Sequence, residues 1–180
     1  MKKIWILLCL LTPLLVAAQV SQVRLQASGL TCSMCTNAIH KSLKGLDFVN
    51  DIQVDIKNST FQLGFKTDKV VDFDQIKAAV EDAGFFVAQF YAVVNFPKVQ
   101  ASNDSHLAVG GLMFHFLNIK NSVLEGEKTV RLLDKGFVSG KEYKKNKALT
   151  QMACYGTGVA GACCSKSGVP TGTRIFHVTI

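Results

Sequence analysis

Two cysteines near the start of the chain have the residue type and spacing of a metal site. Cys32 and Cys35 lie in the segment GLTCSMC at residues 29–35, at the start of a predicted helix. Unpaired backbone N–H groups and the helix dipole favour thiolate over thiol there, so both sulfurs can bind one ion. Thiolates prefer soft metals such as Cu(I), and nothing nearby completes the four ligands of a structural zinc site. Two thiolates alone suit a two-coordinate ion: Cu(I), Ag(I) or Hg(II).

A looser group of potential ligands lies in the second half of the chain. Cys154, Cys163 and Cys164 fall in or beside a Gly-rich segment, and His115 and His177 lie in apolar, strand-like segments. His106, Met113 and Met152 are also available as donors. If the strands of His115 and His177 are neighbours, their imidazoles and a thiolate could form a second copper site. A disulfide from Cys154 to either other cysteine is the usual arrangement in a small exported domain, where it would stabilise the fold by about 2–4 kcal/mol. The sequence leaves the disulfide, the metal site and free buried thiols as alternatives.

The residues around the first pair predict strand, helix, strand, strand, helix, strand over residues 20–91. Apolar residues alternate in the predicted strands, so one face of the sheet is buried and the other is wet. Two predicted helices with apolar stripes supply the cover, and Asp72 and Gln75 have the spacing of a capping box at the start of the second. This is the pattern of the split βαβ, ferredoxin-like arrangement.

The arrangement resembles the heavy-metal-associated domain, the module of copper chaperones, copper-ATPase tails and the periplasmic mercury-binding protein. The family's loop reads GMTCxxC; here Leu30 replaces the methionine that packs beneath the loop, and leucine fills a similar volume. The family's Ala-Gly-Phe after the second helix is matched by residues 83–85. The zinc-exporting branch tends to have Asp before the first cysteine, so Thr31 favours copper. The resemblance covers residues 22–91 and leaves the remainder unassigned.

The resemblance implies that Cys32 and Cys35 bind Cu(I) and pass it on by thiolate exchange, with Cys32 as the more exposed ligand. It implies a metallochaperone for copper trafficking or sequestration, not an enzyme, whose partner is a copper-transporting or copper-receiving protein. Hg(II), Ag(I) and Zn(II) remain alternative ions. Capture of Hg(II) is an alternative function, because linear dithiolate coordination suits it equally. Thiol–disulfide exchange at the same two cysteines is another alternative function.

Residues 92–180 predict a different unit. Pro97 indicates a linker over 92–105, and short strand-like runs separated by Gly and Ser predict a small all-β domain over 106–180, a barrel or a sandwich. Residues 20–91 carry seven basic and eight acidic side chains, whereas residues 92–180 carry eleven and five. The predicted fold class is therefore α+β, with a ferredoxin-like βαββαβ domain at 19–91 followed by a mostly-β domain.

Residues 1–18 have the features of a secretory signal. Lys2 and Lys3 precede an apolar run that is too short to span a bilayer, and Ala18 allows cleavage before Gln19. We therefore expect a periplasmic or secreted protein with no stable membrane anchor. Five of the six cysteines follow Gln19, and an odd number in an oxidising compartment leaves at least one thiol outside internal disulfides.

Composition narrows the function classes further. Of the 180 residues, 48% are hydrophobic and 18% are charged, which excludes a disordered or low-complexity chain. The formal net charge is +7, but we expect no nucleic-acid partner for an exported protein. The sequence contains no hydrolase triad, paired-carboxylate site, phosphate loop or dinucleotide fingerprint. These observations predict a metal-binding protein and not an enzyme.

Overall fold

The computed structural model describes residues 20–30 and 33–180. The predicted signal segment, Thr31 and Cys32 lie outside the described residues. Within the described part of the chain, no helix has the length and apolar character needed to cross a membrane.

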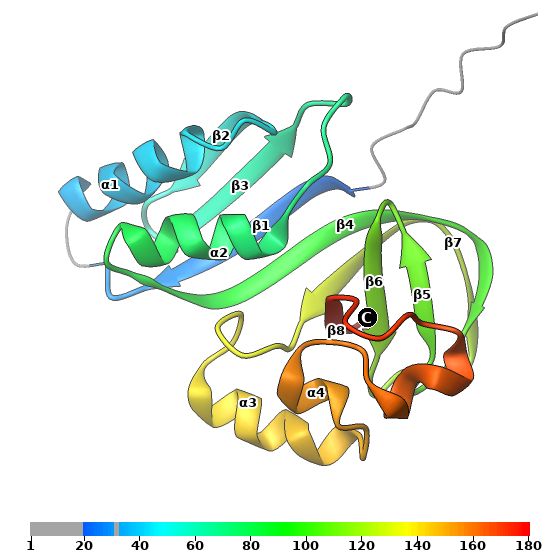
Figure 1. Ribbon diagram of the computed structural model, residues 1–180. Helices are drawn as coiled ribbons and strands as arrows, with labels where there is room; N and C mark the ends of the chain where they lie inside the picture. The colour runs from blue at the N-terminus through cyan, green and yellow to red at the C-terminus, as the bar shows by residue number, and fades with distance from the viewer. Residues whose placement is uncertain (1–19, 31–32) are drawn as a thin grey trace, which may run out of the picture.

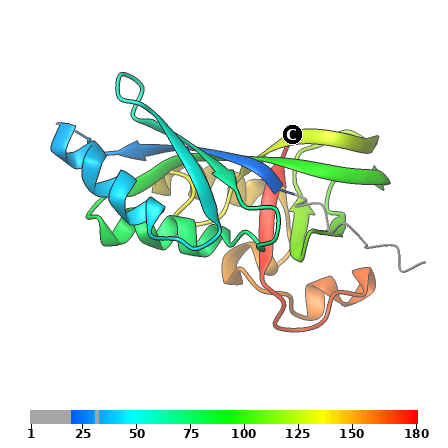
Figure 2. The same cartoon turned by 90° about the horizontal axis from the view of Figure 1, so that it is seen from above.

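The first half folds as βαββαβ. Its elements are β1 (Val20–Ser28), α1 (Ser33–Lys44), β2 (Val49–Asp55), β3 (Thr60–Phe65), α2 (Phe73–Asp82) and β4 (Phe86–Ala101). The strands are antiparallel in the order β2-β3-β1-β4, and α1 and α2 cover one face of them (Figures 1 and 2). Val23 and Leu25 on β1 face Leu63 and Phe61 on β3, and all four are fully buried. The predicted ferredoxin-like fold is therefore confirmed.

Short-range signals set the ends of α2. The Asp72 carboxylate accepts a hydrogen bond from the backbone N–H of Gln75 at 3.1 Å, and the Gln75 side-chain amide donates to the same carboxylate at 3.1 Å. After the helix, Gly84 has φ 88°, in the left-handed region that favours glycine, and turns the chain into β4. The predicted capping box is therefore present, and Gly84 follows the end of the helix.

The second half continues the same sheet. Its elements are β5 (His106–Val109), β6 (Leu112–Phe116), β7 (Ser122–Leu132), α3 (Gly140–Asn146), η1 (Lys147–Leu149), α4 (Cys154–Thr157), η2 (Ala162–Ser167) and β8 (Ile175–Thr179), where η marks a 3-10 helix. The described strands form one eight-stranded sheet in the order β2-β3-β1-β4-β7-β8-β6-β5. β6 and β8 pair in parallel. This half is rich in sheet, but the predicted barrel or sandwich is not confirmed.

β4 runs through most of the segment predicted as a linker at 92–105. Val94 and Phe96 are buried on one side of the strand, and β7 pairs with it there. Pro97 lies at a register shift between Phe96 and Val99, where its missing N–H breaks no regular ladder bond. The linker prediction is therefore corrected, because a proline at a bulge bends a strand without ending it.

The second half contains short helices, so the prediction of an all-β domain over 106–180 is wrong in these segments. Residues 136–139 and 148–154, which fall inside the predicted all-β domain, lie in turns and loops, in η1 and at the start of α4. α3 begins where the Ser139 hydroxyl accepts a hydrogen bond from the backbone N–H of Glu142 at 3.3 Å. Helices of seven and four residues are too short to show a repeating apolar stripe.

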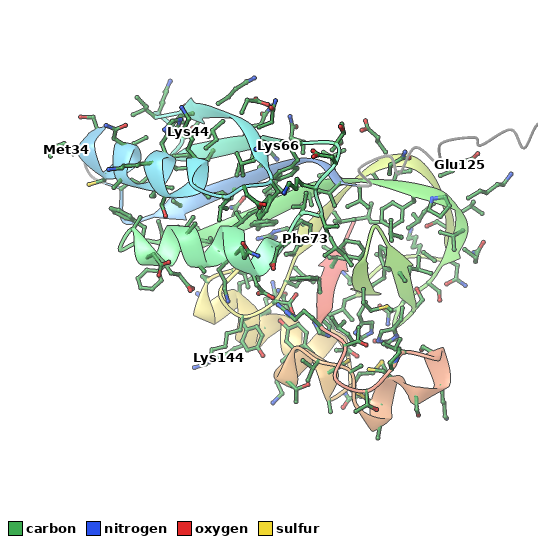
Figure 3. The ribbon with its side chains drawn as sticks, turned by 45° about the horizontal axis from the view of Figure 1, so that its top comes forward. Met34, Lys44, Lys66, Phe73, Glu125 and Lys144 are labelled. Atoms are coloured by element: carbon green, nitrogen blue, oxygen red, sulfur yellow. The ribbon has the colours of Figure 1, made fainter. Side chains whose placement is uncertain are left out.

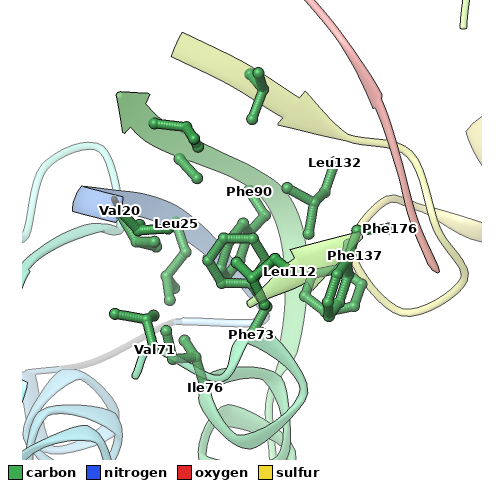
Figure 4. Packing of buried hydrophobic residues seen from close by; sticks show 14 of the residues in the cluster. Val20, Leu25, Val71, Phe73, Ile76, Phe90, Leu112, Leu132, Phe137 and Phe176 are labelled. Atoms are coloured by element: carbon green, nitrogen blue, oxygen red, sulfur yellow. The ribbon is translucent and has the colours of Figure 1, made fainter. Parts of the chain in front are cut away.

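One buried apolar cluster spans both halves of the molecule (Figure 4). Five aromatic rings at its centre pack edge to face or tilted, with centroids 5.1 to 6.4 Å apart. They come from α2, β4, β6, β8 and the turn after β7, and they are Phe73, Phe90, Phe114, Phe176 and Phe137. The two halves share a sheet and a core, and their independence as domains stays a prediction.

Candidate metal centres

The start of α1 positions the second cysteine of the predicted CxxC pair. Cys35 is partly buried in the first turn, on the same stripe as Ile39 and Leu43, which are fully buried. No acidic side chain stands in this turn to neutralise the helix dipole, so the dipole favours a thiolate at Cys35. Cys32 lies outside the described residues, and its convergence with Cys35 on one ion stays a prediction.

Apolar side chains support the loop that leads into α1. Gly29 has φ 86°, and a side chain there would meet the Phe85 ring at 3.8 Å. Leu30 and Phe85 are partly buried and pack against the core. Leu30 thus packs against the core beneath the loop, as the replacement for methionine predicts.

The surface beside this loop is apolar. Met34 is 81% exposed at the outer end of α1, and Ile56 is 65% exposed (Figure 3). Both residues line a shallow hollow of about 430 Å³, together with His40. Met34 therefore faces solvent as a spacer between the two cysteines.

The structure brings the three remaining predicted cysteines together. The Sγ atoms of Cys154, Cys163 and Cys164 all lie within 4.8 Å of one another, and we call these residues the thiol cluster. Cys154 begins α4, and the other two lie on η2, with their sulfurs 3.5 Å apart. All three are free thiols in the structure, so the expected disulfide is not formed there.

The three thiols differ in burial and acidity. Cys154 and Cys164 are fully buried, whereas Cys163 is partly exposed. Burial raises the pKa of the Cys154 thiol, and the sulfur of Cys164 raises it further. Partial burial is the largest single influence on Cys163 and acts to raise its pKa, but the hydrogen bonds with Cys164, Cys154 and the backbone of Gly161 together outweigh it, so the pKa of Cys163 is lowered. Cys163 is therefore the most accessible thiol of the cluster and ionises most readily.

Three histidines lie side by side next to the thiol cluster. His106 on β5 pairs with His115 on β6, and His115 pairs with His177 on β8, so the three form a row across neighbouring strands. The His106 and His115 rings are nearly parallel with centroids 4.3 Å apart, and the His177 ring meets His115 edge-on at 5.0 Å. We call these residues the histidine row.

Carboxylates fix the orientation of two rings of this row. His115 Nε2 lies 3.1 Å from Asp104 Oδ1, and His177 Nδ1 lies 2.9 Å from Asp134 Oδ1. Burial, reinforced by the neighbouring histidines, lowers the pKa of His115 to about 4, so its ring is neutral at pH 7. A carboxylate only accepts hydrogen bonds, so Nε2 carries the proton and Nδ1 keeps its lone pair. That Nδ1 faces Cys154 Sγ at 3.6 Å.

Several ring nitrogens of the histidine row have no partner. Both nitrogens of His106 and Nε2 of His177 are buried without a hydrogen bond among the described residues. His106, His115 and Cys154 also place one donor atom each within 4.8 Å of one another. His177 belongs to neither group of three close donors, since its Nδ1 faces Asp134. Of the predicted second-site residues, the three cysteines and His115 are brought together and His177 lies one ring further away.

Comparison with known proteins identifies the first half. Residues 24–86 match the heavy-metal-associated domain family. The copper chaperone CopZ of Bacillus subtilis is 35% identical over 68 residues, which are 38% of this chain and 97% of the chaperone. The chain belongs to the heavy-metal-associated domain family. The family match ends at residue 86 and does not reach the thiol cluster.

Longer proteins also carry a related heavy-metal-associated domain. A probable copper-transporting ATPase, HMA5 of Arabidopsis thaliana, is 35% identical over 66 residues, which are 37% of this chain but 6% of the ATPase. A probable copper-exporting P-type ATPase of Archaeoglobus fulgidus is 31% identical over 70 residues and is covered to 9%. The chain thus spans less than a tenth of these two relatives. A solved structure of a CopZ metallochaperone is 31% identical in sequence. The match covers all of the metallochaperone and 38% of this chain, with a TM-score of 0.35.

The sequence indicated the heavy-metal-associated domain and offered His106 as an available donor, but it did not place His106 opposite His115 and gave no sign of the two carboxylates. The signal for His106 was present in Gly110-Gly111, whose φ values of 62° and 79° are those of a two-residue hairpin turn. Such a turn pairs residues symmetrically, which sets His106 opposite His115. Asp104 and Asp134 gave no comparable signal, because their contacts join segments 11 and 43 residues apart.

Proposed function

We propose that the heavy-metal-associated domain of this protein binds one Cu(I) through Cys32 and Cys35 and serves in copper trafficking or sequestration. The observation that carries the proposal is the position of Cys35 in the first turn of α1, where no acidic side chain opposes a thiolate. The relation to CopZ and to copper ATPases supports copper as the ion. Two soft thiolates hold Cu(I) in a two-coordinate site, which leaves the ion open to attack by a further thiolate.

Metal transfer at such a site needs no change in covalent bonds of the protein. A thiolate of the receiving protein adds to the two-coordinate ion, and one of the original thiolates then leaves. The exposed apolar surface around Met34 and Ile56 lies beside the loop that an incoming ligand must reach. A copper-transporting or copper-receiving protein with its own pair of cysteines is the partner that fits this chemistry.

Titration of the reduced chain from Gln19 onwards with Cu(I), without oxygen, tests the proposal. Intact-complex mass spectrometry and competition with a Cu(I) chelator count the bound ions. We expect Cys32→Ser combined with Cys35→Ser to remove one equivalent, because serine does not replace a soft thiolate. Ser33→Ala, between the two cysteines, is the matched control and should remove none. An unchanged ion count in the double variant would refute the proposal.

The choice between Cu(I) and Hg(II) requires a direct competition, because linear coordination by two thiolates suits both ions. The single-site variant for this competition carries Cys163→Ser and Cys164→Ser, so that only the domain's own pair is compared. If equimolar Hg(II) displaces Cu(I), and if the chelator also removes Cu(I) from the protein, mercury capture is favoured. Retention of Cu(I) against the chelator supports copper handling.

We also propose that the protein is exported and matures by cleavage before Gln19. Support comes from the basic start, the short apolar run and Ala18. The expected result is a mature form whose N-terminal residue is Gln19, found in the periplasmic or secreted fraction. Intact mass of the purified protein and fractionation of the producing cells measure both. A full-length protein recovered from the cytoplasm would contradict this part of the proposal.

A further inference from the structure

We propose that the second half of the chain holds a separate soft-metal site in which Cys154, Cys163 and Cys164 bind one Cu(I), with His115 as the residue that positions Cys154. This site goes beyond the function proposed for the heavy-metal-associated domain and does not depend on it. The four residues come from β6, α4 and η2, so the fold and not the local sequence assembles them.

The spacing of the three sulfurs is that of ligands around a single ion. Metal–thiolate bonds are about 2.3 Å long, so three sulfurs in a plane around one ion lie about 4 Å apart. In the thiol cluster all three sulfurs lie within 4.8 Å of one another, and the closest two are 3.5 Å apart. The observed spacing is therefore close to that of three thiolates around one ion.

The donor set favours Cu(I) over zinc. A structural zinc ion takes four ligands in a tetrahedron. Within the described residues, no histidine, carboxylate or fourth cysteine joins this group of three at the same close spacing. Cu(I) accepts three thiolates, and the soft thioethers of Met113 and Met152 pack against the same cluster.

His115 has the arrangement of a histidine that supports a metal site. His115 Nε2 lies 3.1 Å from Asp104 Oδ1, and Nδ1 on the other side of the ring lies 3.6 Å from the sulfur of Cys154. Thr150 donates to the same Asp104 oxygen at 2.6 Å and holds the carboxylate in place. Groups that orient a metal ligand from outside the coordination shell commonly contribute 10- to 100-fold to metal affinity, and His115 has this position relative to Cys154.

Ordinary burial of cysteine does not account for this region. A single buried cysteine packs like a small apolar residue. Here three thiols gather at one place, and Cys154 also lies within 4.8 Å of donor atoms of His106 and His115. The partial exposure of Cys163 gives an ion a way in from solvent.

The new site is far from the CxxC loop. The start of α1 and η2, which is drawn in orange, lie at opposite ends of the molecule in both views (Figures 1 and 2). A copper ion held at one end therefore has no direct contact with ligands at the other. The two sites can be tested separately by removing either one.

The test uses the reduced chain from Gln19 onwards with Cys32→Ser and Cys35→Ser, which lacks the first pair. This variant should still bind one Cu(I) per chain in competition with a chelator. Adding Cys163→Ser and Cys164→Ser should abolish that binding. Ser165→Ala on η2 is the matched control and should keep it. X-ray absorption at the copper edge should show sulfur neighbours only.

A positioning role for His115 is tested through its carboxylate. Asp104 has φ 59°, a left-handed conformation that asparagine tolerates well, so Asp104→Asn keeps the backbone while it weakens the hold on the ring. We expect Cu(I) affinity to fall 10- to 100-fold, with unchanged circular dichroism of the metal-free protein. Unchanged affinity would refute the positioning role.

Three outcomes separate this inference from the proposed function. If the Cys32/Cys35 variant is folded and binds no Cu(I), the second site does not exist. If Cu(I) binding survives removal of Cys154, Cys163 and Cys164 in that background, the ligands are wrong. If the wild type and the Cys32/Cys35 variant bind equal numbers of ions, the proposed function of the first pair fails while this site stands.

Discussion

The two sulfur sites of this protein occupy contrasting surroundings. Cys35 of the predicted CxxC pair stands in the first turn of α1, beside the exposed Met34, whereas the thiol cluster lies on α4 and η2 with Cys154 and Cys164 buried. We expect an incoming ligand to reach an ion at the proposed first site directly. At the second site it must enter past Cys163. The contrast teaches that one chain can give the same kind of donor atom two different accessibilities, one suited to exchange and one to retention.

The largest expected effect is a loss of stability when the core shared by the two halves is disrupted. Phe73 on α2 contacts Phe90 of the first half and Phe114 and Phe176 of the second. Phe73→Ala leaves a cavity in this shared core and should reduce the free energy of unfolding by about 3–5 kcal/mol. Because the core is common, both halves should lose stability in one transition. Thermal unfolding followed by calorimetry measures this.

A matched control for Phe73→Ala lies on β4. Phe86 is 68% exposed, so Phe86→Ala should change stability by only about 0.5 kcal/mol or less. Limited proteolysis complements the calorimetry, since two independent domains should be cut between residues 91 and 106 into two folded pieces. Two separate melting transitions, with only one shifted by Phe73→Ala, would show that the regions are independent and restore the two-domain prediction.

A smaller effect is expected from the polar link between the regions. Arg174 donates to Asp74 on α2 at 2.7 Å and lies 3.4 Å from Asp134, the buried partner of His177. Arg174→Met leaves Asp134 buried without its cation. Removing one partner of a fully buried pair costs about 3–5 kcal/mol, and partial exposure of Arg174 reduces the expected loss to about 2 kcal/mol.

Chemical denaturation of the metal-free protein measures the effect of Arg174→Met. Lys69→Met is the control, because the ion pair of Lys69 with Asp47 is solvent-exposed and should contribute nothing measurable. An equal loss in both variants would mean that the link between α2 and Arg174, the residue before β8, does not stabilise the protein.

The three thiols of the cluster differ in exposure to solvent, and this difference predicts the order in which they are chemically modified. In the Cys32/Cys35 variant, Cys163 should react with iodoacetamide at least about tenfold faster than Cys154 or Cys164, because it is exposed and its pKa is lowered. Peptide mass spectrometry over time measures the order. Three thiols should be counted after denaturation without reductant. A count of one would restore the disulfide that the sequence predicts.

The smallest expected effect is a pH dependence that belongs to the second region. The unfolded chain takes up a proton on His115 near pH 6.5, whereas the buried native ring stays neutral until about pH 4. Stability of the metal-free protein should therefore fall as pH drops from 6.5 towards 4, because protons bind the unfolded state more strongly. Asp104 offsets part of this effect of burial.

His115→Gln should flatten that pH dependence, and chemical denaturation at pH 7 and pH 5 measures it. Cys35→Ser, in the other region, should leave the pH dependence as it is in the wild type. An identical slope in His115→Gln and wild type would assign the effect to another group.

The sequence predicted the first region well because its signals are local. The alternation in β1 and β3, the Asp72 cap and the Gly84 stop each lie within a few residues of the element that they define. The CxxC pair is local in the same sense, since two residues separate its members. For the same reason the resemblance to a known domain could be recognised from a few residues.

The second region could not be predicted to the same depth because its contacts are distant in sequence. β8 enters between β7 and β6, and no local pattern indicates that order. Cys154 meets His115 from 39 residues away, so the sequence could name both as donors without establishing their contact. The linker predicted from Pro97 was wrong for a related reason, since only the pairing of β4 with β7 shows that the strand continues past this proline.

The position of β8 has a consequence for how the protein reaches its native state. During synthesis β6 and β7 are made before β8, although both pair with β8 in the sheet. Each therefore lacks one of its sheet partners until β8 has been made. Until then two strand edges stay open to pairing with other chains. Contacts between segments so far apart in sequence also form slowly. The second region is therefore the part of the molecule most exposed to misassembly during folding, and variants that weaken β8 should first reveal themselves as aggregation.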